Sequence, residues 1–145
     1  MNSAMKKENY KKLNLIIDKL KSTDDPKRKY EYILWLGKKL SEPKDSLLVP
    51  DNKVKGCVSE VYVRANLIDG KLYWEGYSDA LITKGLLSFL IEGLEGLSPD
   101  EVMNLNQNFI EDTGLKSSLT PSRSNGFLNI LLKMKSQANN FCISQ

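Results

Sequence analysis

Apolar residues recur at helical spacing in the N-terminal part of the chain. An apolar stripe that faces away from the lysines predicts an amphipathic helix over residues 6–21. The stripe consists of Leu13, Ile16, Ile17 and Leu20. A carboxylate followed by proline, at Asp25 and Pro26, is a typical helix start and predicts a second helix over residues 26–41.

The apolar period changes to two after a loop-like stretch over residues 43–57. Small or apolar side chains alternate with polar or larger ones over residues 59–65, which predicts a half-buried strand. Asp69 and Gly70 form a two-residue hairpin signal, and residues 72–77 supply the returning strand. The pattern therefore predicts one antiparallel hairpin.

Residues 80–93 are apolar almost all round, which predicts a buried helix that crosses the sheet. Ser98 to Glu101 form a capping box that begins a short helix, and another short helix is expected near residues 108–113. A long helix is expected to begin at Thr120-Pro121. Residues 138–145 are expected to form a frayed tail.

The length of the chain, 145 residues, favours one domain, and neither an internal repeat nor a low-complexity linker divides it. The predicted fold class is α+β, a single domain with a small antiparallel sheet packed by several helices. The net charge is mildly basic, 21 − 18 = +3. The N-terminal basic residues are interleaved with apolar ones, as on a solvated helix face or a docking surface for a protein, so no nucleic-acid partner is expected.

Two residue counts exclude several kinds of chemistry. The chain has no histidine and only two cysteines. A Ser-His-Asp or Cys-His system lacks its imidazole, and two cysteines cannot form a structural zinc site. Carboxylate-only metal sites, lysine chemistry and lone-thiol chemistry remain open at this point, and we expect no metal. No apolar stretch approaches the roughly 20 residues of a membrane span, and no signal peptide is evident. We expect a cytoplasmic location without a membrane partner, or an organelle stroma if a transit peptide was removed.

Cys57 is the candidate reactive group. It follows Gly56 at the junction between the loop and the first strand, with Lys53 and Lys55 close by. Positive charge lowers the pKa of a thiol and thereby favours the nucleophilic thiolate. Glycine beside the thiol allows another backbone or a partner to approach. Cys57 also falls on the same alternation as Ser59, so a buried structural cysteine remains the alternative interpretation.

Three blocks of sequence carry a family resemblance. They are G-C-V-S-E-V at residues 56–61, S-D-A-L-I-T-K-G at residues 78–85 and L-T-P-S-R-S-N-G at residues 119–126. In type, order and spacing they resemble the SufE family, the sulfur-acceptor partners of cysteine desulfurases. The resemblance covers residues 10–137, with residues 1–9 as an N-terminal extension and 138–145 as a C-terminal tail.

The resemblance implies a SufE/IscU-like α+β fold, with Cys57 on a loop at one end of the sheet. It implies that Cys57 accepts sulfur from a persulfide on a PLP-dependent cysteine desulfurase and passes it to an iron-sulfur scaffold, while stimulating desulfurase turnover. The protein would be a carrier and activator, not an enzyme, without a cofactor of its own, since PLP belongs to the desulfurase. We expect apolar neighbours to shield Cys57 until the partner docks, and movement of the 51–57 loop to present it.

Residues near the thiol have two interpretations each. Asp79 either caps the helix over residues 80–93 or restrains the Cys57 loop. Lys84 either pairs with an acidic neighbour or adds positive potential near the thiol. Arg123 lies in the first turn of a helix, where a cation opposes the helix dipole, so a carboxylate or a partner surface is expected to hold it.

The remaining candidates are Ser59, Lys53 and Lys55. Ser59 either packs locally or forms a hydrogen bond near the thiol, and the two lysines are candidate partner contacts. Cys142 lies outside the resemblance and is expected to be an incidental free thiol that forms no disulfide with Cys57.

Three other functions compete with the sulfur carrier. An iron-sulfur scaffold of the related fold uses three cysteines at its site, and here only Cys57 is in place. A peroxidase-like thiol enzyme would need a resolving thiol or a pocket for peroxide. An adaptor would act through its surface alone, with Cys57 dispensable.

Overall fold

A computed structural model describes residues 9–144 of the chain. Six helices, two strands and two short 3-10 turns follow one another within these residues. They are α1 (Lys11–Lys21), α2 (Pro26–Gly37), η2 (Pro50–Asn52), β1 (Val61–Ile68), β2 (Lys71–Ser78), α3 (Leu81–Leu94), α4 (Pro99–Asn104), α5 (Phe109–Asp112), η3 (Leu115–Ser117) and α6 (Pro121–Ser144). The α+β class is therefore confirmed. The expected start of the first helix, at residues 6–8, lies outside the described residues.

The sheet is the single hairpin that the sequence predicts. Strands β1 and β2 pair antiparallel, from Val61 opposite Ser78 to Ile68 opposite Lys71. Asp69 and Gly70 form the turn with φ of 51° and 77°, as a two-residue turn with two positive φ angles requires. The strand starts two residues later than the alternation suggested, so residues 59–60 belong to the loop that carries the candidate thiol.

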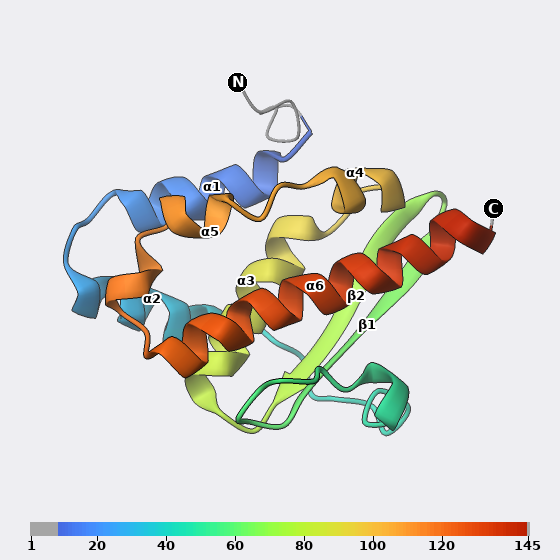
Figure 1. Cartoon of the computed structure of the whole chain (residues 1–145), viewed down its shortest axis with the longest axis horizontal. Coiled ribbons are helices and arrows are strands. Elements are labelled where there is room, and N and C mark those ends of the chain that lie inside the picture. The colour runs from blue at the N-terminus through green and yellow to red at the C-terminus, as the bar shows by residue number, and fades with distance from the viewer. Residues whose placement is uncertain (1–8, 145) are drawn as a thin grey trace.

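Helix α3 is the central element of the core. It is buried along most of its length and packs against α1, α2, α6 and β2 (Figure 1). Helix α2 crosses it very closely, because two glycines meet. A Cβ atom on Gly37 would lie 2.9 Å from the backbone nitrogen of Gly85, and one on Gly85 would overlap the carbonyl of Ile33. This crossing fixes the first turn of α3, which borders the candidate site.

Helix α6 runs along most of the molecule and lies over the sheet and α3 (Figure 1). It begins at Pro121, and the Thr120 hydroxyl accepts a hydrogen bond from the Arg123 amide at 3.2 Å. The expected fraying from residue 138 onward is wrong, since the helix continues to residue 144. Ala138 is fully buried and Phe141 packs against the core, so apolar contacts hold these last turns.

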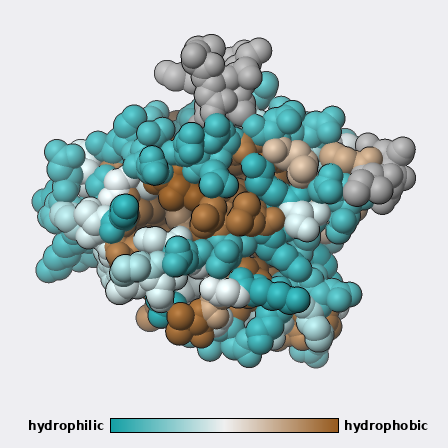
Figure 2. Space-filling model, in the orientation of Figure 1, coloured by the Kyte–Doolittle hydropathy of each residue, from teal (hydrophilic) through white to brown (hydrophobic). Residues whose placement is uncertain are grey.

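Hydrophilic side chains cover most of the face in Figure 2, and apolar side chains reach the surface near its middle. Within residues 9–144, no helix has both the length and the apolar content to cross a bilayer.

Candidate functional site

Cys57 lies on a short loop at one end of the hairpin. The base of the loop is closed by the backbone, since the Val54 amide donates to the Val61 carbonyl at 2.8 Å and Lys53 forms a bridge with Tyr62. Residues 55–60 leave the sheet beyond these two pairings. Three of them, Gly56, Cys57 and Ser59, contact α6. The thiol is thus presented on a segment whose two ends are fixed.

One face of α6 receives this loop. Arg123, Gly126 and Asn129 follow one another at intervals of three residues, so each lies next to the one before it on the surface of the helix. Gly126 accepts a weak hydrogen bond from the Cys57 Sγ atom at 3.9 Å, and a Cβ atom on Gly126 would lie 3.7 Å from that sulfur. The helix therefore supplies a close-packed seat for the half-buried thiol.

The electrostatics of Cys57 differ from the expectation based on Lys53 and Lys55. Burial raises the pKa of the Cys57 thiol, and the guanidinium of Arg123 partly opposes that rise. Lys53 forms an ion pair with Glu60, with 2.8 Å between Nζ and Oε2. The side chain of exposed Lys55 makes no hydrogen bond within the described residues. The prediction that these two lysines acidify the thiol is wrong, because one is paired and the other projects into solvent.

Arg123 is held by hydroxyl groups. Its Nη1 atom donates to Ser59 Oγ and to Thr83 Oγ1, each at 2.6 Å. In the described part of the chain no carboxylate lies within ion-pair distance of Arg123, so the first of its two expected roles, a structural salt bridge, is wrong. The second, a contact with a partner surface, stays a prediction. Ser59 thus forms its hydrogen bond beside the thiol. The sequence did not predict Thr83 as a partner of Arg123, because a threonine within a helix gives no sign of a hydrogen bond to an arginine 40 residues away.

Asp79 restrains the loop. Its Oδ1 atom accepts a hydrogen bond from the Glu60 amide at 3.1 Å. The alternative role as a helix cap is wrong, because the N-cap residue of α3 is Ala80 and no side chain caps it. The Ser78 hydroxyl instead accepts from the Ala80 amide at 3.2 Å, which shapes the turn before the helix.

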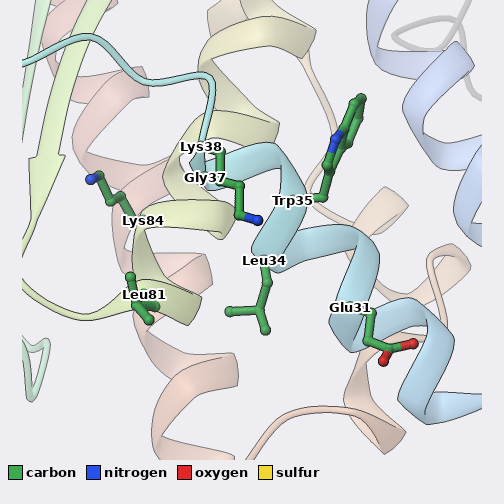
Figure 3. A pocket seen from close by; sticks show the side chains of 7 residues that line it. All are labelled: Glu31, Leu34, Trp35, Gly37, Lys38, Leu81 and Lys84. Carbon is green, nitrogen blue, oxygen red and sulfur yellow. The ribbon is translucent and has the colours of Figure 1, made fainter.

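Lys84 lies in a groove between α2 and α3, and its two expected roles receive no support. It forms no ion pair among the described residues, and it is not among the causes of the thiol's pKa shift. The groove has a volume of about 310 Å³, and Leu34, Trp35 and Leu81 line it with Lys84 (Figure 3). Leu81 is 74% exposed. This open, mainly apolar groove therefore lies beside Leu81, two residues after Asp79 in the sequence.

Cys142 is separate from the site. Both cysteines are free, and Cys142 Sγ lies 3.3 Å from the Asp100 carboxylate. Cys57 sits at Gly126, and at 1.5 Å per residue Cys142 lies about 24 Å further along α6. That separation is far beyond the reach of a disulfide, so Cys142 cannot resolve an oxidised Cys57 within this fold.

No metal-binding cluster gathers near the thiol. Within residues 9–144, no three His, Cys, Asp or Glu side chains lie close enough together to hold a metal ion. A cluster-binding scaffold would need several thiolates at one site, and Cys57 is the only cysteine at this one. The site therefore offers one thiol, Cys57, to an incoming reactant.

Comparison with known families and proteins shows which family the chain belongs to. A family model described as "SufE: Fe-S metabolism associated domain" matches residues 14–138. The chain belongs to the SufE family. A SufE-like protein of Synechocystis is 48% identical over 130 residues, which cover 90% of this chain and 82% of the relative.

Two other SufE relatives are longer than this chain. The SufE-like protein 1 of Arabidopsis thaliana, named as chloroplastic/mitochondrial, is 39% identical over 88% of this chain and 34% of its own length. The cysteine desulfuration protein SufE of Plasmodium falciparum is 38% identical over 77% of this chain and 47% of its own. The chain thus spans about a third and about half of these two proteins.

The fold also matches a solved structure. The solution structure of a hypothetical protein from Thermus thermophilus aligns with a TM-score of 0.77 and 27% identity, over 89% of this chain and 94% of that one. The SufE resemblance in the three sequence blocks is therefore confirmed at the level of family and fold.

Proposed function

We propose that this SufE family chain is a sulfur acceptor and carrier whose Cys57 takes sulfur from a cysteine desulfurase. The observation that carries the proposal is the seat of Cys57: a single half-buried thiol on a restrained loop, with Arg123 as the charge that favours its thiolate. Relatives from two Plasmodium species are named cysteine desulfuration proteins. That name supports a desulfurase as the partner.

The transfer needs only one thiol on this chain. The Cys57 thiol gives up its proton, and the thiolate attacks the outer sulfur of a cysteine persulfide on the desulfurase. A new S–S bond forms on Cys57, the S–S bond of the donor breaks, and the donor cysteine leaves as a thiolate that takes up a proton. The sulfur moves without net oxidation or reduction, so no metal, flavin or resolving thiol takes part.

Arg123 and the burial of Cys57 have opposite effects on this step. Burial disfavours the thiolate and protects a persulfide from solvent oxidants. The guanidinium favours the thiolate, and it would likewise favour the negatively charged persulfide that follows transfer. In the free protein the persulfide on Cys57 would therefore react slowly. The partner would have to move the loop away from α6 before the sulfur could be transferred.

The remaining parts of the proposal concern partners. The carrier passes its sulfur to an iron-sulfur scaffold by the same exchange, and it raises desulfurase turnover by removing the persulfide. It is not itself an enzyme and carries no cofactor, since PLP stays on the desulfurase. Neither nucleic acid nor membrane is a partner, and the cytoplasm or an organelle stroma provides the reducing compartment.

Alanine formation from cysteine by a cysteine desulfurase tests the proposal. We expect the wild-type chain and the Cys142→Ala variant to accelerate turnover, and the Cys57→Ser variant to lose the acceleration. Full acceleration by Cys57→Ser would contradict the carrier role and would indicate an adaptor that acts through its surface alone.

A further inference from the structure

Three contacts join α6 to the loop that carries the thiol, one per helical turn. Arg123 reaches Ser59, Gly126 touches Cys57, and Asn129 reaches Gly56 on the upstream side. The chain of the loop therefore runs antiparallel to the helix and rests on a single face of it. Of the three helix residues, Asn129 lies outside the sequence blocks that the SufE resemblance rests on.

The contact between Asn129 and Gly56 is tight. Asn129 Nδ2 donates to the Gly56 carbonyl oxygen at 3.1 Å. A Cβ atom on Gly56 would lie only 2.6 Å from the same Nδ2 atom, and Gly56 has a φ of +80°, which side chains rarely tolerate. Glycine at this position thus permits both the backbone conformation and the close approach of the amide.

Asn129 has no substitute on the upstream side of Cys57. On the downstream side, Asp79 accepts from the Glu60 amide and Arg123 donates to Ser59. Among the described residues, Asn129 supplies the only side-chain hydrogen bond to the backbone between residues 54 and 59. If that bond breaks, the Gly56-Cys57 peptide can turn away from α6 while the downstream contacts persist.

We propose that Asn129 is a positioning residue that fastens the upstream side of the loop to α6 and keeps the Cys57 sulfur seated against Gly126. Its effect on the thiol is a property of the free protein. Its effect on sulfur transfer rests on the proposed function: a partner that draws out the thiol must first break the Asn129–Gly56 bond. The reactivity of the resting thiol is therefore set by a side chain that does not touch the sulfur.

The test is the pH profile of Cys57 alkylation by iodoacetamide, measured without any partner. Asn129→Ala removes the amide, and Asn129→Leu removes the donor at nearly constant size. Both variants carry Cys142→Ala, so that only Cys57 reacts. One lost hydrogen bond predicts alkylation about two- to tenfold faster at neutral pH. The midpoint of the profile should fall, because burial is what raises the pKa of Cys57.

Two further variants complete the test. Asn129→Gln keeps the donor on a longer arm and should lie between the wild type and the alanine variant. Asn125→Ala makes the same chemical change at an exposed asparagine of α6 whose side chain makes no hydrogen bond within the described residues, and it should leave the profile unchanged. Thermal unfolding identifies the folded variants, and if the alanine variant does not fold, the leucine and glutamine variants decide.

Wild-type rate and midpoint in the folded Asn129→Leu variant would overturn the proposal, as would an equal change in Asn125→Ala. Failure of the desulfurase to load Cys57, together with the expected alkylation profile, would refute the proposed function and leave the role of Asn129 standing.

Discussion

Replacing Arg123 with methionine tests the electrostatic account of the site. Within the described residues, Arg123 is the charged group that lowers the pKa of Cys57, against the larger effect of burial. Methionine keeps a long apolar stem but removes the charge and both hydrogen bonds. Asp79 and Asn129 still hold the loop on either side of the thiol, so the burial of the sulfur should persist.

The cost to stability can be estimated from the two hydrogen bonds that are lost. Both measure 2.6 Å, one to Ser59 and one to Thr83. Thr83 is only 3% exposed, so its hydroxyl loses its partner in a buried place, at a cost of about 1–3 kcal/mol. Ser59 is half-buried and can turn toward water. We expect a loss of about 2–3 kcal/mol in the free energy of unfolding, which a typical domain of about 5–15 kcal/mol survives.

The assay is again alkylation of Cys57 across a pH series, in the Cys142→Ala background, with urea unfolding as the measure of stability. Removal of the guanidinium leaves burial unopposed, so the pKa of Cys57 should rise. The midpoint should therefore move to higher pH, and alkylation at neutral pH should become slower because the thiolate is the reactive form. Lys55→Met removes a positive charge two residues from the thiol and should leave the midpoint unchanged.

Two results would refute this reasoning. One is a folded Arg123→Met variant whose midpoint stays in place or moves to lower pH. The other is a Lys55→Met variant that shifts the midpoint as much as Arg123→Met does. The second result would restore the interpretation that charge on the loop itself sets the acidity of the thiol.

Two further predictions concern the loop restraint and the α2–α3 crossing. Asp79→Ala should speed hydrogen exchange at the Glu60 amide about fivefold, since its acceptor is lost; unchanged protection would contradict the restraint. Gly85→Ala should lower the free energy of unfolding in urea by about 2–3 kcal/mol, because the new methyl overlaps the Ile33 carbonyl of α2. Gly93→Ala, on the same helix, meets the Leu13 side chain at 2.8 Å and the Leu13 Cα atom at 3.3 Å, a less severe overlap than that with the Ile33 carbonyl. It should therefore cost less, and equal losses would count against the close crossing.

Local signals in the sequence were sufficient for much of the fold. The Asp69-Gly70 turn has the positive φ angles that its residues favour, and Ser98 and Glu101 form the capping box that their spacing indicates. The end of α6 was missed although a signal existed. Ala138 and Phe141 follow Met134 at four and seven residues, so they continue the apolar stripe.

The site was only partly predictable. Cys57 and Arg123 stand in sequence blocks that resemble the SufE family, and both lie at the loop seat. Their surroundings depend on contacts between residues far apart in the chain, such as Asn129 with Gly56, 73 positions away. The pairing of Lys53 with Glu60 likewise appears only once the bridge to Tyr62 closes the loop. A charge count along the sequence cannot reveal which cation is free to act on the thiol.

The central claim is that Cys57 carries the sulfur, and intact-protein mass spectrometry tests it most directly. The chain is incubated anaerobically with an active cysteine desulfurase and cysteine, alongside the Cys57→Ala and Cys142→Ala variants. The account predicts a mass increase of one sulfur atom that a thiol reductant reverses, that Cys142→Ala retains and that Cys57→Ala abolishes. A reversible sulfur adduct of equal amount on the Cys57→Ala variant would contradict it.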